Sequence, residues 1–164
     1  MIIDAHSHLW LKQDAVVDGQ PIQTLPTNGS RSIFFGEEVQ MLPPFMIDGI
    51  NSAEIFLSNM DYAQVGGAVV VQEVIDGNQN SYLAEVQRKY ANRFCCLGMA
   101  DSIQDVDRIM EIGLKGISIP GHRLLGTSLL NKMPLFKYLE EKGLILSMCL
   151  ADNEVQISEM AEVI

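Results

Sequence analysis

The sequence predicts an α/β fold in which parallel β-strands alternate with α-helices. Two observations support this prediction. Apolar runs of strand length, such as the continuous Gly-Ala-Val-Val-Val run at residues 67–71, alternate with segments whose apolar residues recur at helical spacing. From the second strand onwards, the strands recur at about 20 to 30 residues, which is typical of parallel βα units.

The individual elements follow from these patterns and from helix start and stop signals. Asn51 is a predicted N-cap, with Glu54 three residues later as its capping-box partner. Further helices are expected after Asn80, Ser102 and Asn153, and a proline at a first helical position predicts one at Pro134. The predicted strands are residues 2–5, 67–71, 94–100, 116–119 and 144–150.

One segment interrupts the alternation. Residues 11–50 contain four prolines and scattered glycines, and we assign them no strand or helix. Structureless loops of this length are usually functional or disordered. If the first strand belongs to a barrel, a segment that follows it directly is expected to lie over the mouth of the active site.

The composition indicates one soluble globular domain covering residues 1–164. A net charge of −10 disfavours binding to nucleic acid or to anionic membranes, which require positive patches. No apolar stretch approaches the roughly 18 residues of a membrane span, and the first residues lack the pattern of a signal peptide. Three cysteines without a Cys-x-x-Cys pair argue against a zinc knuckle and favour a reducing compartment, so a cytoplasmic location is expected.

The end of the first strand carries a His-x-His pair. Side chains alternate along a strand, so Asp4, His6 and His8 are expected on one face, with Ala5 and Ser7 packed on the other. Two imidazoles spaced in this way can converge on one divalent metal, for which zinc is the main candidate. Two polar residues that simply end a strand are the alternative interpretation.

Several segments, taken in order, resemble the amidohydrolase superfamily, specifically its amidohydrolase-2 (amidohydrolase-related) branch. The similarity covers nearly the whole chain outside residues 11–50. Its first-strand motif matches Ile3-Asp4-Ala5-His6-Ser7-His8-Leu9-Trp10. The later matching segments are Met60-Asp61-Tyr62-Ala63, Val69-Val70-Val71-Gln72, Asn80-Ser81-Tyr82-Leu83, Tyr90-Ala91-Asn92-Arg93-Phe94 and Leu114-Lys115-Gly116-Ile117.

The resemblance implies a (β/α)8 TIM barrel with its site at the carboxyl ends of the strands. It also implies that His6 and His8 are metal ligands, and that many relatives use one divalent metal while some lactonases work without metal. The family usually has a histidine at the end of strand five, where this chain has Cys149, either a thiolate ligand or a packing residue. The strand-four neighbourhood Gly116-Ile117-Ser118-Ile119-Pro120 lacks the basic residue found in many relatives, which argues against a lysine-bridged binuclear site.

Other polar residues follow predicted strands and are candidates for the same mouth. Glu73 is a candidate catalytic carboxylate or a partner of a surface cation, and Asp101 is expected only to help cap the next helix. His122 is a candidate for substrate or metal contact, and Arg123 for binding a substrate carboxylate. Asp152 is either an oxygen ligand or a helix N-cap.

A complete barrel of this type needs about 250 residues, whereas 164 residues supply about five βα units. We therefore expect either a longer natural protein or homo-oligomers that cover the open strand edges. The leading hypothesis is a metal-dependent hydrolase or lyase that acts on a small acid, lactone or ester. The alternatives are a metal-independent lactonase-like enzyme and a non-catalytic binding barrel or inactive fragment.

Overall fold

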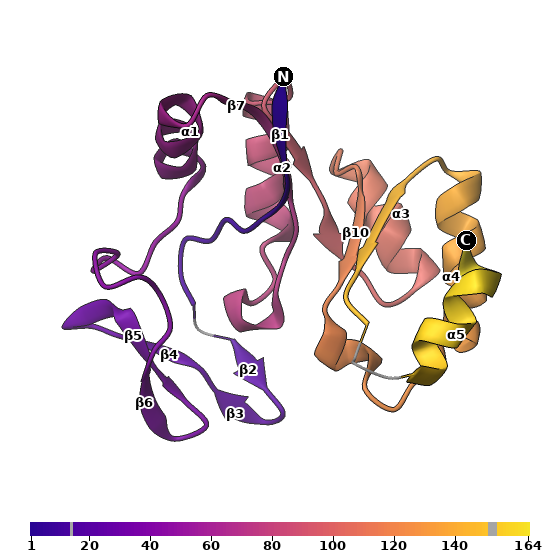
Figure 1. Ribbon diagram of the computed structural model, residues 1–164, viewed down its shortest axis with the longest axis horizontal. Coiled ribbons are helices and arrows are strands. Elements are labelled where there is room, and N and C mark those ends of the chain that lie inside the picture. The colour runs from indigo at the N-terminus through magenta and orange to yellow at the C-terminus, as the bar shows by residue number, and fades with distance from the viewer. Residues whose placement is uncertain (14, 151–153) are drawn as a thin grey trace. The chain divides into compact units, whose positions relative to one another are not determined.

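A computed structural model describes residues 1–13, 15–150 and 154–164, apart from the side chain of His122. The chain divides into two compact units, Met1–Gln79 and Asn80–Ile164, which are described separately. Figure 1 shows the elements in chain order, from β1 at the N-terminus to α5 at the C-terminus.

The first unit is built on a parallel strand pair. β1 (Ile2–Ser7) pairs with β7 (Val65–Val70), with Ile3 opposite Gly67 and Ser7 opposite Val70. The register shifts between Asp4 and Ser7, which marks an irregularity in β1 just before the two histidines. A 3-10 turn, η1 (Val74–Asp76), follows β7. The predicted first and second strands are confirmed.

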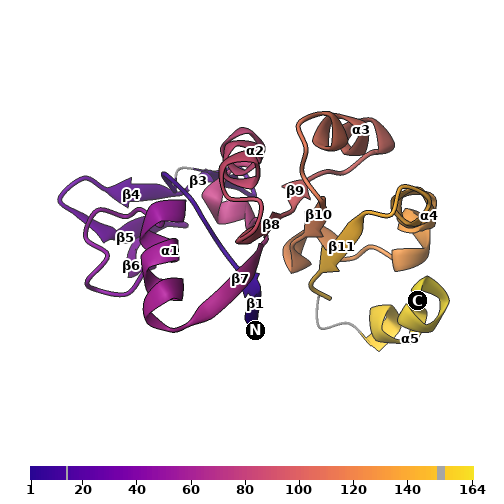
Figure 2. The same cartoon turned by 90° about the horizontal axis from the view of Figure 1, so that it is seen from above.

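The insertion is not the structureless loop that we predicted. It forms β2 (Val16–Val17) and β3 (Gln20–Pro21), which pair with each other, and an antiparallel sheet of β4 (Gln23–Leu25), β5 (Asn28–Phe34) and β6 (Glu37–Gln40) (Figure 2). Two-residue turns with positive φ at both positions close two of the hairpins. These turns are Asp18-Gly19, with φ of 49° and 77°, and Phe35-Gly36, with φ of 49° and 83°.

α1 (Ala53–Tyr62) connects the insertion to β7. Its N-cap is Ser52, whose hydroxyl accepts a hydrogen bond from the Ile55 N–H, so the prediction of Asn51 as the cap is wrong. Asn51 is instead held in an antiparallel bridge with Trp10. Of its apolar residues, Met60 is buried whereas Ile55 is exposed.

The second unit contains a three-stranded parallel sheet in the order β11–β10–β9. The single strand predicted at residues 94–100 is divided at Leu97 into two short strands. The elements are α2 (Asn80–Lys89), β8 (Phe94–Cys96), β9 (Gly98–Met99), α3 (Ile103–Glu111), β10 (Gly116–Ile119), α4 (Met133–Glu141), β11 (Ile145–Met148) and α5 (Glu154–Val163), with 3-10 turns η2 (Gly121–Leu124) and η3 (Leu129–Lys132) after β10.

β10 is the central strand of the second unit and is buried along its whole length. The helices bury apolar residues at the predicted spacing, as Val106 and Ile109 of α3 and Leu135 and Leu139 of α4 show. Ser102 caps α3 by accepting from the Asp105 N–H, which confirms that predicted start. Alternating strands and helices therefore form as the sequence predicts, although the described residues form no closed barrel.

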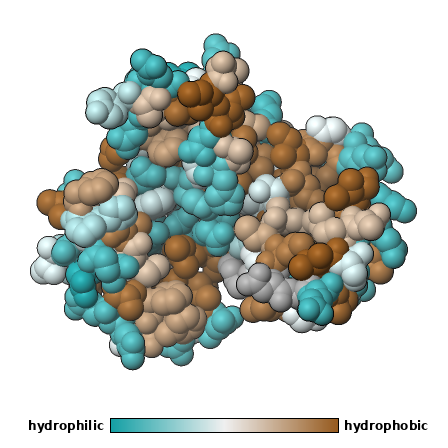
Figure 3. All heavy atoms as spheres, viewed as in Figure 1, coloured by the Kyte–Doolittle hydropathy of each residue, from teal (hydrophilic) through white to brown (hydrophobic). Residues whose placement is uncertain are grey.

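The first strand leaves apolar side chains uncovered. Ile2 and Ile3 are 62% and 55% exposed, and brown atoms gather at the start of β1 in Figure 3.

Within the described ranges, every helix is too short or too polar to cross a membrane.

We predict that Gly116→Ala destabilises the protein by about 3 kcal/mol, because β10 and β11 must separate to admit the new methyl group. A Cβ atom built on Gly116 would lie only 2.0 Å from the Ile145 carbonyl oxygen. Urea unfolding measures the effect. Gly121→Ala is the control, since its Cβ would meet neighbours at ordinary contact distances of 3.5 Å. Equal stabilities of the two variants would contradict the prediction.

Candidate functional site

His6 and His8 meet at the end of β1. Their Nε2 atoms lie 3.1 Å apart, and the ring centroids are separated by 4.8 Å with the planes at 74°. This contact agrees with the prediction that both side chains lie on one face. A hydrogen bond between two imidazoles requires one Nε2 to carry a proton and the other to accept it. The two rings can therefore share a single proton, or both Nε2 atoms can bind the same ligand or metal ion.

Backbone contacts hold the pair in place. The Asp4 carboxylate accepts from the His6 N–H at 3.1 Å, and Asn51 Nδ2 donates to the His8 carbonyl at 2.7 Å. Between the histidines, buried Ser7 donates to the Val69 carbonyl and ties β1 to β7. Ala5, however, is exposed, so the prediction that it packs on the opposite face is wrong. The strand irregularity after Asp4 breaks the simple alternation there.

His8 lies in an environment that favours its neutral form. Burial is the largest cause and lowers the pKa of His8 below 6.5, and the neighbouring His6 lowers it further. The charges of Glu73 and Asp4 and a backbone interaction with Val71 act in the opposite direction but do not reverse the shift. His8 Nδ1 is buried without a well-formed hydrogen bond. A neutral ring is the form of histidine that coordinates a metal.

The histidine pair fits two positions of a metal site. Tetrahedral zinc, with Zn–N distances of about 2.0 to 2.1 Å, places two nitrogen ligands about 3.3 Å apart, close to the observed Nε2 separation. Among the residues that the structure describes, His, Cys, Asp and Glu form no group of three or more that could hold a metal. The pair can therefore provide two ligands to a metal, and the described residues form no complete metal site.

Glu73 lies close enough to influence this pair. It follows β7, is half-buried, and makes no side-chain hydrogen bond to cap η1. Its negative charge raises the pKa of His8, so the structure brings this predicted carboxylate toward the histidines. Neighbouring Gln72 is buried and accepts from the Gln79 N–H at 2.7 Å, which holds the segment after β7.

Sequence reasoning missed a buried carboxylate beside this segment. Asp76 is 2% exposed and accepts a hydrogen bond from Gln13 Nε2 at 2.9 Å. Burial raises the pKa of Asp76 to about 6, although the bond from Gln13 opposes the shift. Gln13 Oε1 is buried without a partner, and the Gln13 carbonyl accepts from Thr24. No local pattern links residues 13 and 76, so the sequence carries no signal for this pair.

The second unit holds the remaining candidates. Arg123 pairs with Asp101 at 3.0 Å, so Asp101 provides a counter-ion for that guanidinium in addition to preceding the cap of α3. Cys149 is exposed, which makes the packing interpretation wrong, and its N–H donates to the Ile119 carbonyl. The backbone of His122 lies in η2, whereas its side chain and all of Asp152 lie outside the described residues.

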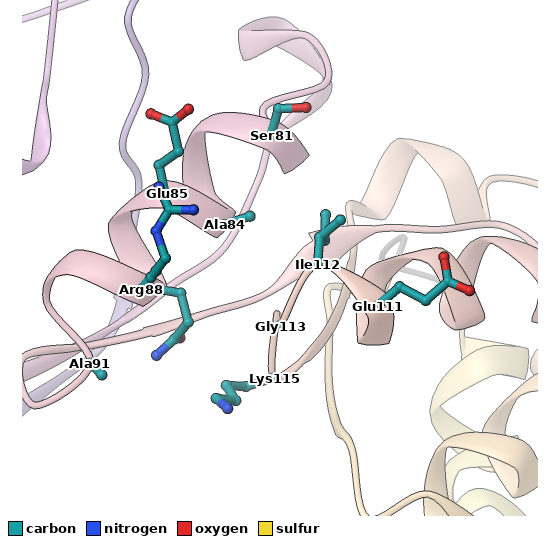
Figure 4. A pocket seen from close by; sticks show the side chains of 10 residues that line it. Ser81, Ala84, Glu85, Arg88, Ala91, Glu111, Ile112, Gly113 and Lys115 are labelled. Carbon is teal, nitrogen blue, oxygen red and sulfur yellow. The ribbon is translucent and has the colours of Figure 1, made fainter.

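A hollow of about 820 Å³ lies elsewhere in the second unit. Figure 4 shows Glu85 and Arg88 of α2 on one side of it and Ile112 and Lys115, from the link between α3 and β10, on the other. Lys115 directly precedes β10, so this hollow lies at the amino end of the strand. Candidate residues such as Arg123 follow the carboxyl ends, and the hollow is therefore not part of the candidate site.

Comparisons with known proteins concern the family and the fold of the chain. A family profile described as amidohydrolase matches residues 3–163. One similar crystal structure is a probable 2-pyrone-4,6-dicarboxylic acid hydrolase from Acinetobacter baumannii with citric acid bound, at 16% identity and a TM-score of 0.56 over 90% of this chain. Another is an Agrobacterium tumefaciens protein in its apo form, at 10% identity and a TM-score of 0.59 over 98% of this chain.

The chain spans about half the length of these two structures, covering 48% and 51% of them. At these identities the likeness concerns the fold alone. A search of curated protein sequences found no significant match.

We predict that Asp76→Asn stabilises the protein by about 3 kcal/mol near pH 8 and has little effect near pH 4. Burial raises the pKa of Asp76 to about 6, so the folded state retains a proton that the unfolded chain loses from about pH 4 upwards. Stability from this group therefore falls as the pH rises through about 6. Urea unfolding at both pH values measures the effect.

Exposed Asp48→Asn is the matched control and should be neutral at both pH values. An Asp76→Asn variant that gains nothing near pH 8 relative to about pH 4 would contradict the assigned cause.

Proposed function

The chain belongs to the amidohydrolase family, and on this basis we propose a hydrolase or lyase that acts on a small acid, lactone or ester with a divalent metal. The observation that carries the proposal is the pair of Nε2 atoms of His6 and His8, 3.1 Å apart at the end of β1. Two neutral imidazoles at this separation suit one divalent cation, of which zinc is the first candidate.

The residues of this chain have distinct roles in the proposal. His6 and His8 hold the metal, which when bound polarises a carbonyl or lowers the pKa of a water molecule. Glu73 is the candidate general base, because its carboxylate is half-buried and its charge acts on His8. His122 and Asp152 are further candidate acid–base groups, assigned from their positions in the sequence.

Arg123 is the candidate for binding a substrate carboxylate. Its pairing with Asp101 orients the guanidinium, and a substrate anion would have to compete with that aspartate. The similarity to a structure titled as a probable 2-pyrone-4,6-dicarboxylic acid hydrolase supports the choice of lactones and small acids as the first substrates to test.

The proposed enzyme is part of a TIM-type barrel of about five βα units, completed by further chain or by a second copy. The exposed Ile2 and Ile3 on β1 support additional pairing at this strand, because uncovered apolar strands attract partners. Sedimentation of the 164-residue chain distinguishes self-association from a monomer that needs more sequence.

A metal-independent hydrolase is the second candidate. The contact of two Nε2 atoms at 3.1 Å also suits an acid–base pair in which His6 and His8 share one proton. The absence of a third ligand among the described residues keeps this alternative open.

The double variant His6→Ala/His8→Ala is predicted to lose more than about 100-fold in affinity for zinc, because both nitrogen ligands are removed. Competition with a chromogenic chelator measures the affinity, and elemental analysis after growth without chelators measures the bound metal. The control is His122→Ala, which changes the only other histidine and should retain metal while losing turnover. Equal metal content in the wild type and the double variant would refute the metal assignment.

Treatment with EDTA is predicted to abolish the hydrolysis of lactones and esters, and added zinc should restore it, because the metal activates the attacking water. The measurement is a pH-stat assay over a panel of lactones and esters. Full activity in EDTA would establish the metal-independent alternative. No turnover by a full-length form with any divalent metal would refute the hydrolase proposal.

A further inference from the structure

A groove of about 450 Å³ opens beside His8 within the first unit. It lies between the end of the insertion and α1, and its volume is within the range of small-molecule sites. Most of its wall is apolar. The main apolar contributors are Trp10, Phe45, Ile47, Ile50, Ile55 and Phe56.

The floor of the groove is held by hydrogen bonds. The Trp10 indole N–H donates to the Gly49 carbonyl at 2.9 Å, and backbone bonds of 3.0 and 3.1 Å join Trp10 to Asn51. A Cβ atom on Gly29 would meet the Gly49 nitrogen at 2.4 Å, so β5 supports this segment by direct backbone contact. The floor is therefore formed before any ligand arrives, which lowers the entropic cost of binding.

The rim exposes large apolar side chains to water. Phe45, Ile47 and Ile55 are 81%, 62% and 45% exposed. Such clustered apolar exposure around a hollow is typical of a binding groove. The favourable change on binding is the removal of this surface from water, which rewards an apolar ligand.

The charges near the groove disfavour ligands that carry several carboxylates. Its described lining contains Asp48 and includes no lysine or arginine. The negative charges of Glu73 and Asp4 also act on His8, which lines the groove. A ligand with two or three carboxylates would find no counter-ion here and would meet like charges.

We propose that this groove binds the alkyl or aryl substituent of a neutral lactone or ester, and that His8 lies at the end where the carbonyl is placed. The proposal rests on the proposed function and adds the substrate class. The groove selects for apolar length and against negative charge, and its described lining does not include Arg123, the candidate for binding a substrate carboxylate.

The test uses Trp10, the only tryptophan in the chain, as a reporter inside the groove. Titration with γ-butyrolactone, γ-hexalactone, γ-octalactone and γ-decalactone should change its fluorescence, with Kd falling about fourfold per added methylene until the groove is filled. 2-Pyrone-4,6-dicarboxylate should cause no saturable change. Equal Kd values across the series, or tighter binding of the dicarboxylate, would overturn the proposal.

A matched pair of variants checks the location. Ile47→Asp places a carboxylate on the rim and should weaken γ-decalactone binding at least about tenfold, because a charge opposes an apolar ligand. Ile157→Asp is the control, since Ile157 lies on α5 and is 60% exposed, close to the 62% of Ile47. Identical binding by the two variants would also overturn the proposal.

The outcomes separate this inference from the proposed function. If binding strengthens with the alkyl length of the lactone but a full-length form of the protein hydrolyses none of the lactones, the hydrolase proposal is refuted and the groove proposal is supported. Hydrolysis with a kcat/KM that does not depend on chain length would refute the groove and leave the hydrolase standing.

Discussion

The first unit depends on the backbone bridge between Trp10 and Asn51. The insertion of some forty residues lies between Trp10 and Asn51. The two hydrogen bonds of the bridge join its two ends, close to the end of β1 and the start of α1. The Asn51 side chain then holds the carbonyl of His8, and the Trp10 indole holds Gly49. This one antiparallel contact therefore supports both the position of His8 and the shape of the adjacent groove.

Burial and charge oppose each other at the candidate site. Desolvation favours neutral His8, whereas Glu73 and Asp4 favour its charged form, and desolvation has the larger effect. Desolvation also raises the pKa of Asp76 to about 6, although the hydrogen bond from Gln13 opposes this shift. A neutral imidazole beside a carboxylate can accept a proton or coordinate a cation, which suits ligand binding and proton transfer.

The α/β alternation could be predicted because its signals are local. Continuous β-branched runs such as residues 67–71 and capping residues such as Ser102 act within a few positions of the chain. The insertion hairpins were missed although Asp18-Gly19 is a strong local turn signal, because their strands are short and one contains Pro21. Asn51 was misassigned because the adjacent Ser52 is also a preferred cap residue, and because the bridge of Asn51 to Trp10 is made by backbone groups that leave no sequence signal.

The sequence by itself determined the strands and helices of the alternation, the family, and the approach of His6 to His8, because a two-residue spacing at a strand end places both rings on one face. Only the tertiary structure decided which residues far apart in the sequence lie together within each unit. The pairing of Gln13 with Asp76, the charge of Glu73 beside His8 and the contact of Arg123 with Asp101 all depend on how the chain returns to itself. The burial of His8 and Asp76, and the resulting shifts of their pKa values, depend on these long-range contacts, which no local sequence pattern specifies.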